Sequence, residues 1–217
     1  MIVEIIFIIV IVLILLINLL LRSVAKTCKG LKNTSKLSGM EIARILSSKL
    51  SNEEPHIIKK SGRFLDHYNR DRNVIKLSPE VFDGEDMYAA TMAINVALET
   101  DKERKNVSLG RKMNSFLVMA SYIMIIIGAI AKNDLIIHLG MILFVLTFII
   151  EFVLLASLFK TEEDLNNLYE LIKKEKLVKP IEDYKDNYLL VALSRLATLP
   201  YNFINYFRWT CIKSAQI

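Results

Sequence analysis

Three long apolar runs alternate with polar stretches along the chain. The first run covers residues 1–21 and is almost uninterrupted Ile, Leu and Val, with Glu4 near its start and Asn18 near its end. A helix that crosses the hydrocarbon core of a bilayer needs about 20 mostly apolar residues. The alternative is a secretory signal peptide, but this run lacks the basic leader and the small-residue cleavage site that mark one. We therefore interpret it as a transmembrane anchor.

The other two runs lie close together, at residues 116–131 and 135–159. Only Lys132, Asn133 and Asp134 separate them. Because a break this short cannot return the chain across the bilayer, we expect an antiparallel helical hairpin whose turn reaches the far side of the membrane.

Basic residues give these spans a direction. Five follow the first run with no acid among them: Arg22, Lys26, Lys29, Lys32 and Lys36. Five more precede the second run: Lys102, Arg104, Lys105, Arg111 and Lys112. The hairpin turn holds only Lys132. Since basic residues gather on the cytoplasmic side, the pattern predicts a multi-pass protein of the cell membrane with residues 22–114 in the cytoplasm and the amino terminus outside.

The polar segment carries signals for both helix and strand. Ser38 and Glu41 form a Ser-x-x-Glu capping box, which predicts a helix over residues 39–50. Residues 56–60 and 73–77 are β-prone and flank turn-rich sequence, so we expect a small sheet or hairpin.

Two more helices are expected before the second apolar run. Ser78 and Pro79 begin a helical stretch, since proline suits a first helical turn. Residues 83–86 interrupt that stretch and cap a helix over 87–100. The fold class is thus α+β, mainly helical, in a membrane protein.

The last part of the chain predicts two amphipathic helices. The first begins at Thr161 and stops at Pro180, and the second covers residues 184–199. Residues 187–207 are alternatively a fourth span, although Arg195 and the following proline favour a helix lying on the membrane surface.

The chain thus divides into four expected parts. They are a transmembrane anchor (1–21), a cytoplasmic domain (22–114), a transmembrane helical hairpin (115–159) and C-terminal cytoplasmic or membrane-associated helices (160–217).

Composition agrees with a membrane protein. Hydrophobic residues make up 53% of the 217 residues, above the roughly 45–50% of soluble domains. The net charge of +5 follows from the topology bias, and no basic stripe with interleaved aromatic residues predicts nucleic-acid binding. Cys28 and Cys211 have no zinc-binding spacing and are interpreted as free thiols.

Several short motifs together resemble a known family. They are Ser-Gly-Met-Glu-Ile-Ala-Arg at residues 38–44, Gly-Arg-Phe-Leu-Asp-His-Tyr at 62–68, Val-Ile-Lys-Leu-Ser-Pro-Glu-Val at 74–81, and the Glu151-Phe152 pair. In this order, over about residues 10–200, the chain resembles the bacterial YugP-like family of membrane-bound neutral zinc metallopeptidases. The resemblance implies a small zincin-like α+β unit.

The resemblance also implies a zinc site with the motif His-Glu-x-x-His on the helix after the Leu-Ser-Pro segment. Two histidines four residues apart bind the metal from one helical face, and the glutamate acts as general base. By spacing, these positions fall on Asn95, Val96 and Glu99. The histidines of the chain are His56, His67 and His138, and no two have the required spacing. We therefore expect a degenerate site without catalytic residues, in a divergent member of the family.

Glu151 matches the third zinc ligand that the resemblance implies, but Val153 departs from the family's Glu-Phe-x-Ala pattern. A carboxylate within an apolar run is costly and points to a functional site. It could line a remnant polar pocket with Asn95 and Glu99, which would suit Mg²⁺, Mn²⁺ or Ca²⁺ better than zinc. Alternatively, it lies near the interface, hydrated or paired with a basic side chain such as Lys160.

The remaining family-like residues are interpreted as structural. His67 lies in a turn, where its ring is expected to bond to the backbone or to Asp66. Arg63 and Tyr68 are most simply parts of the scaffold, and His138 is expected at the outer membrane interface.

These observations predict an inactive membrane-bound relative of zinc metallopeptidases that binds or scaffolds a peptide or membrane-protein partner in the lipid bilayer. No metal cofactor is expected, whereas the family it resembles uses zinc. The alternative is a divergent membrane metallopeptidase with a non-standard metal site. A small channel or transporter is disfavoured because the sequence has no internal repeats.

Overall fold

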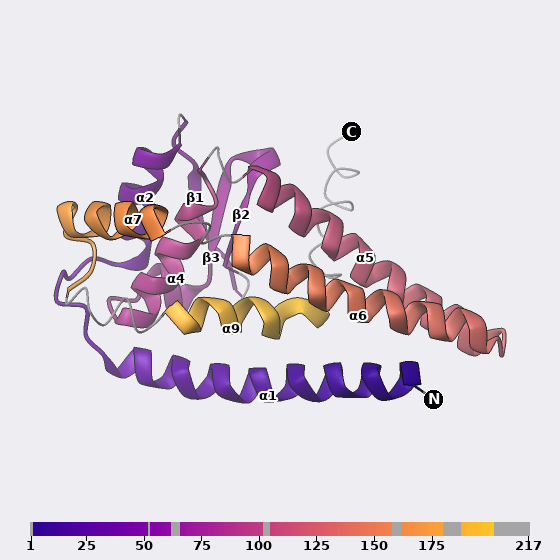
Figure 1. Cartoon of the computed structure of the whole chain (residues 1–217). Helices are drawn as coiled ribbons and strands as arrows, with labels where there is room; N and C mark the ends of the chain where they lie inside the picture. The colour runs from indigo at the N-terminus through magenta and orange to yellow at the C-terminus, as the bar shows by residue number, and fades with distance from the viewer. Residues whose placement is uncertain are drawn as a thin grey trace. The chain divides into compact units, whose positions relative to one another are not determined.

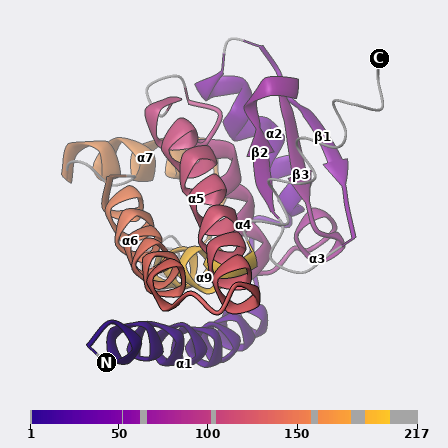
Figure 2. The same ribbon diagram turned by 90° about the vertical axis from the view of Figure 1, so that its right-hand side faces the viewer.

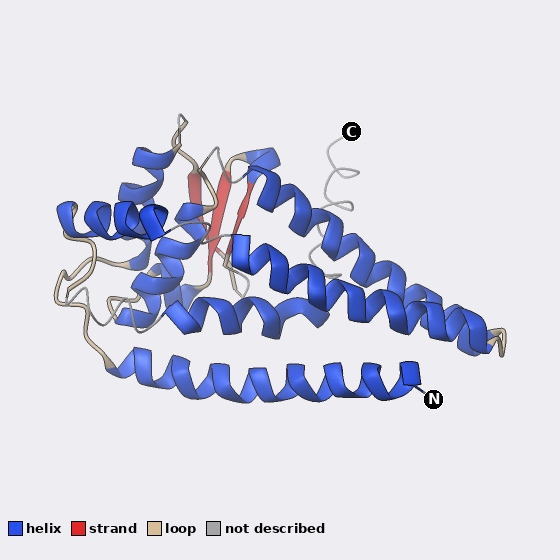
Figure 3. Ribbon diagram, in the orientation of Figure 1, coloured by secondary structure: helices blue, strands red, loops and turns tan. Residues whose placement is uncertain are grey.

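The computed structural model describes residues 2–51, 53–61, 66–101, 105–157, 162–179 and 188–201 (Figure 1). The chain is mainly helical with one small sheet, as predicted (Figure 3). It forms two compact units. The first combines Met1–Leu19, Leu109–Ser157 and Arg195–Ile217, and the second combines Leu20–Ser108 and Leu158–Ser194. The four-part division of the chain stays a prediction.

Within the described residues, three helices are long and apolar enough to cross a membrane. They are α1 (Ile2–Gly30), α5 (Lys105–Ile130) and α6 (Asp134–Ser157). Helices α5 and α6 lie side by side (Figure 2), and a short turn joins them in which Lys132 has a positive φ of 51°. The predicted hairpin is therefore present. Helix α1 continues well beyond the apolar run that predicted it.

The core of the first unit lies between α1 and the hairpin. Val10 and Ile14 of α1 are buried together with Phe144 of α6. The Phe144 ring meets the Phe7 ring edge-on, at 5.5 Å between centroids, and lies 5.7 Å from the Tyr122 ring of α5. Aromatic packing thus fastens the three helices to one another within this unit.

The second unit contains a three-stranded sheet in the order β1-β3-β2. Its strands are β1 (His56–Lys59), β2 (His67–Asn69) and β3 (Val74–Leu77), and a short 3₁₀ turn, Arg70–Arg72, connects β2 to β3. The two predicted β-prone stretches are β1 and β3. They pair in parallel and so belong to a sheet rather than to a hairpin of their own, while β2 pairs antiparallel with β3.

Helices pack beside this sheet. Helix α2 (Gly39–Leu50) has the predicted capping box, and α3 (Pro79–Phe82) begins at the predicted proline. Helix α4 (Met87–Leu98) is capped by Asp86, whose Oδ1 accepts from Ala89 N at 2.8 Å. Helix α2 approaches α3 and α4 closely at Gly39, where a Cβ atom would lie 2.0 Å from the Val81 carbonyl oxygen. Every residue of α4 is buried, and the helix ends two residues before the predicted boundary.

The predicted C-terminal helices are also present. Helix α7 (Glu162–Lys174) buries Leu168 and Ile172. Helix α9 (Tyr188–Thr198) has 11 residues and is followed by a 3₁₀ turn, Leu199–Tyr201. Thr161, Pro180 and residues 202–207 lie outside the described residues, so the choice between a surface helix and a fourth span stays a prediction.

Candidate functional site

The last turn of α4 carries the positions that the family resemblance singles out. Asn95 and Val96 belong to the helix, and Glu99 is its C-terminal capping residue with helical backbone angles, φ −71° and ψ −15°. Asn95 and Glu99 therefore lie about one turn apart on one face, as their spacing predicts. Asn95 is 5% exposed and Val96 is completely buried, whereas Glu99 is partly exposed.

Glu99 contacts the sheet. Its Oε2 accepts from the backbone N–H of Tyr68 in β2, at 3.4 Å. Its carbonyl oxygen accepts from the guanidinium of Arg70 at 2.8 Å, and the carbonyl of Asp101 accepts from the same nitrogen at 2.7 Å. Because carbonyl groups at a helix end lack intrahelical donors, Arg70 satisfies acceptors that the end of α4 leaves open. In this structure, the region of Glu99 serves to hold α4 against β2.

The donor set at these positions does not fit catalytic zinc. Such a site needs three protein ligands, usually imidazole or carboxylate, and an open position for water. Val96 has no lone pair to offer, and Asn95 offers only a neutral amide oxygen. Among the described residues, no group of three or more His, Cys, Asp or Glu side chains is arranged to hold a metal ion. The expectation that the protein binds no metal stays a prediction.

Glu151 lies in α6 and is 2% exposed, yet it has polar partners within the hairpin. The side-chain amide of Asn114 in α5 donates to Glu151 Oε2 at 2.9 Å and also to the Thr147 carbonyl at 3.1 Å. Arg111 Nε lies 3.9 Å from Glu151 Oε1. The carboxylate charge is therefore balanced by α5. Lys160, the basic partner proposed from the sequence, lies outside the described residues.

Sequence reasoning missed the roles of Arg111 and Asn114. The signal that could have found them is the hairpin itself, since residues at similar sequence distances from its turn face each other in antiparallel helices. Arg111 and Asn114 precede the turn by nearly the same distance as Glu151 follows it.

The predicted grouping of Glu151 with Asn95 and Glu99 joins residues from different compact units. It stays a prediction, together with the oxygen-ligated metal that it would allow.

The segment that contains Asp66, His67 and Tyr68 forms part of the scaffold. The carboxylate of Asp66 accepts from Ser78 N at 2.5 Å and from Ser78 Oγ at 3.3 Å, and burial raises the pKa of this carboxyl. The Tyr68 hydroxyl donates to Asn73 Oδ1 at 2.8 Å. These bonds tie β2 to the residues on either side of β3. Arg63 lies outside the described residues.

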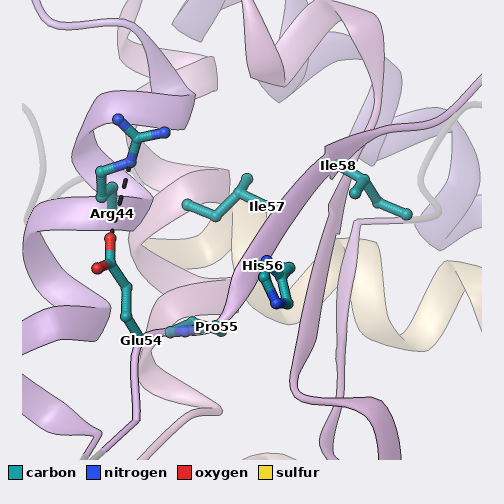
Figure 4. Close-up of a pocket in the computed structure, with 6 residues that line it drawn as sticks. All are labelled: Arg44, Glu54, Pro55, His56, Ile57 and Ile58. Carbon is teal, nitrogen blue, oxygen red and sulfur yellow. Dashed lines mark ion pairs between the residues drawn. The ribbon is translucent and has the colours of Figure 1, made fainter.

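A pocket of about 440 Å³ lies elsewhere in this unit, between α2 and β1 (Figure 4). Its lining residues are Arg44, Glu54, Pro55, His56, Ile57 and Ile58. Arg44 of α2 faces Glu54, with 3.9 Å between Nε and Oε1. The pocket adjoins β1, whereas Glu99 contacts β2 at the opposite edge of the sheet. This pocket is not predicted by the sequence, because it forms only where Arg44 of α2 meets the segment 54–58.

Comparison with known proteins places the chain in a family. The family model described as "Putative neutral zinc metallopeptidase" matches residues 3–186. No curated protein and no solved structure matches the chain. The family match covers most of the sequence and confirms the resemblance drawn from its motifs. The chain therefore belongs to the putative neutral zinc metallopeptidase family.

Proposed function

We propose that this protein is a membrane-bound member of its family that binds peptide segments without cleaving them. The observation that carries the proposal is the last turn of α4, where Asn95 and Val96 are buried at the positions that the family resemblance gives to a zinc-binding histidine and a catalytic glutamate.

These replacements remove both the general base and the zinc ligands that the family mechanism requires. Val96 cannot take a proton, and general-base assistance is typically worth about 10²–10⁴ in rate. Without zinc, nothing lowers the pKa of the attacking water toward neutrality, so little hydroxide forms at the site. Both losses fall on the same step, so hydrolysis by the family mechanism is not expected.

The environment of Glu151 supports the same conclusion. If Glu151 were a metal ligand, the bound cation would balance the negative charge of its carboxylate. Here Arg111 and Asn114 already compensate the carboxylate from within the hairpin. These contacts support a structural role for Glu151 within the hairpin.

The edge of the sheet supports a binding role. His56 N donates to Asn73 O, and Lys60 N donates to Leu77 O, so these residues direct their backbone groups toward β3. Because the backbone N–H and C=O groups of successive residues point to opposite sides of a strand, those of Ile57 and Lys59 point away from β3. An exposed edge of this kind can pair with an extended peptide, and the neighbouring pocket can receive one of its side chains. We propose an extended segment of a membrane-protein partner as the ligand.

A divergent metallopeptidase is the second candidate. It is favoured by one observation: Glu99, at the position that the resemblance gives to the second histidine of the motif, offers a partly exposed carboxylate as a possible metal ligand.

The two candidates are separated by rebuilding the motif. We expect the unmodified protein to show no metal-dependent cleavage of a peptide library. The triple variant Asn95→His, Val96→Glu, Glu99→His should bind more zinc than the unmodified protein, because imidazoles replace poor ligands. A matched triple variant, Asn95→Gln, Val96→Ile, Glu99→Gln, controls for disturbance of α4 and should bind none. Cleavage by the unmodified protein that a chelator abolishes would contradict the proposal.

A further inference from the structure

The exposed face of α1 changes from apolar to cationic along a single stripe. Leu15 and Leu19 are 59% and 61% exposed, and Arg22, Lys26 and Lys29 are exposed further along the helix. Successive members are separated by three or four residues, so all five lie along one side of the helix. The same side that presents leucines to its surroundings thus continues as a row of positive charges.

Helix dimensions place these charges at a definite depth if the apolar part of α1 crosses a bilayer. Twenty residues of helix span about 30 Å, which is the thickness of the hydrocarbon core. Arg22 follows directly after such a length of apolar sequence. The stretch from Arg22 to Lys29 adds about 10 Å, enough to cross the headgroup layer.

Two of the three cations have no counter-charge in the described part of the chain. Lys29 is paired with Glu80 and lies 4.8 Å from the centroid of the Tyr88 ring. For Arg22 and Lys26, the structure records neither a side-chain hydrogen bond nor an ion pair with any described residue. Helix α1 itself contains no acid after Glu4. Both cations are therefore available to an external anion.

We propose that Arg22 and Lys26 bind the phosphate-bearing headgroups of anionic phospholipids, with the acyl chains lying along Leu15 and Leu19. The inference rests on the membrane location in the proposed function. It adds a lipid preference, which neither the family membership nor the degenerate motif implies. Charge complementarity and the continuity of the apolar and cationic stripe select a lipid over a soluble anion, which would not contact the leucines.

The test measures lipid retention. The full-length protein is purified in a neutral detergent and exposed to phosphatidylglycerol or phosphatidylcholine, and bound lipids are counted by native mass spectrometry. The unmodified protein should retain more phosphatidylglycerol than phosphatidylcholine. Two cations near an anionic surface together change affinity by roughly thirtyfold, so Arg22→Gln/Lys26→Gln should lose most of this preference. The charge-preserving Arg22→Lys/Lys26→Arg should keep it.

The matched control removes one arginine and one lysine elsewhere in the same unit. Arg72 and Lys173 are exposed, and Arg72→Gln/Lys173→Gln changes the net charge equally. The control should keep the lipid preference. The inference would be overturned if Arg22→Gln/Lys26→Gln retained as much phosphatidylglycerol as the unmodified protein. It would also be overturned if the control variant lost as much of the preference as Arg22→Gln/Lys26→Gln.

A separate measurement distinguishes this failure from failure of the membrane location. Membranes that contain the unmodified protein are washed with alkaline carbonate. Release of the protein would refute both the location and the lipid site. Retention in the membrane without any preference for phosphatidylglycerol would refute the lipid site alone.

Discussion

The importance of Glu151 can be predicted from the sequence, but its partners cannot. An acidic residue within an apolar run indicates a special site, because burying its charge is costly unless a partner compensates it. Its partners cannot be identified from local sequence, since Arg111 and Asn114 belong to another helix. The structure supplies both contacts and shows that the compensation is internal to the hairpin.

This compensation predicts a stability effect. Replacing Glu151 with alanine leaves Arg111 without this partner in a largely buried position, and breaking such a pair typically costs about 3–5 kcal/mol. We expect Glu151→Ala to lower the melting temperature in detergent markedly. The double variant Arg111→Met/Glu151→Met should recover much of the loss, because it removes both charges.

The matched control for this experiment is Glu170→Ala, which removes an exposed acid from α7. Such surface changes usually stay within about 0.5 kcal/mol. If Glu151→Ala melted at the same temperature as this control, the assigned role of Glu151 would be wrong.

The residues at the end of α4 could be located only through the family resemblance. Asn95 and Val96 sit in a helix that is buried all round, so no polar face sets them apart. The contact between Glu99 and the Tyr68 N–H is invisible in sequence, because the two residues approach each other only when β2 joins the sheet.

Among the helices and strands, the starts of helices could be predicted from local sequence signals, whereas the pairing of strands could not. The start of α2 follows from its capping box, and the start of α4 follows from Asp86. Strand β2 has no recognisable strand signal in the sequence, because its three residues lie in turn-rich sequence and are defined by their pairing with β3. Helix α1 outlasts its apolar run because no glycine or proline stops it before Gly30.

The capping box of α2 allows a direct test. Ser38 Oγ accepts from Glu41 N at 3.3 Å, and the Glu41 carboxylate accepts from Ser38 N at 2.8 Å. Ser38→Ala should therefore lower the free energy of unfolding by about 1 kcal/mol, and Ser38→Gly by only a few tenths. Denaturant titration of the purified protein measures both. An alanine variant as stable as the unmodified protein would show that the cap contributes nothing.

The stabilisation that this cap gives to the folded state should decrease at acidic pH. The N–H of Ser38 and then its hydroxyl hold the pKa of Glu41 below the usual 4.5. A lowered pKa in the folded state adds stability above the usual pKa, and this contribution disappears as pH falls through the lowered value. The difference between Ser38→Ala and the unmodified protein should accordingly shrink in acid.

At the scale of the molecule, the apolar helices and the distribution of basic residues predict a topology. The three long helices are confirmed as elements, while their orientation stays a prediction. We expect Lys105 on the cytoplasmic side and Asn133 on the opposite side, because several basic residues precede the hairpin whereas its turn holds only Lys132. Reporter-enzyme fusions at these two positions should report opposite compartments. The same compartment for both would refute the hairpin topology.

We propose that this protein keeps the fold of its family without the zinc chemistry. The decisive measurement is the zinc content of the full-length protein, purified in detergent from cells grown with added zinc and washed with a chelator. We predict a content far below one zinc per chain, because Asn95, Val96 and Glu99 stand at the positions that the family resemblance gives to the zinc ligands and the general base. One zinc per chain, retained through the wash and accompanied by peptide cleavage, would show that this proposal is wrong.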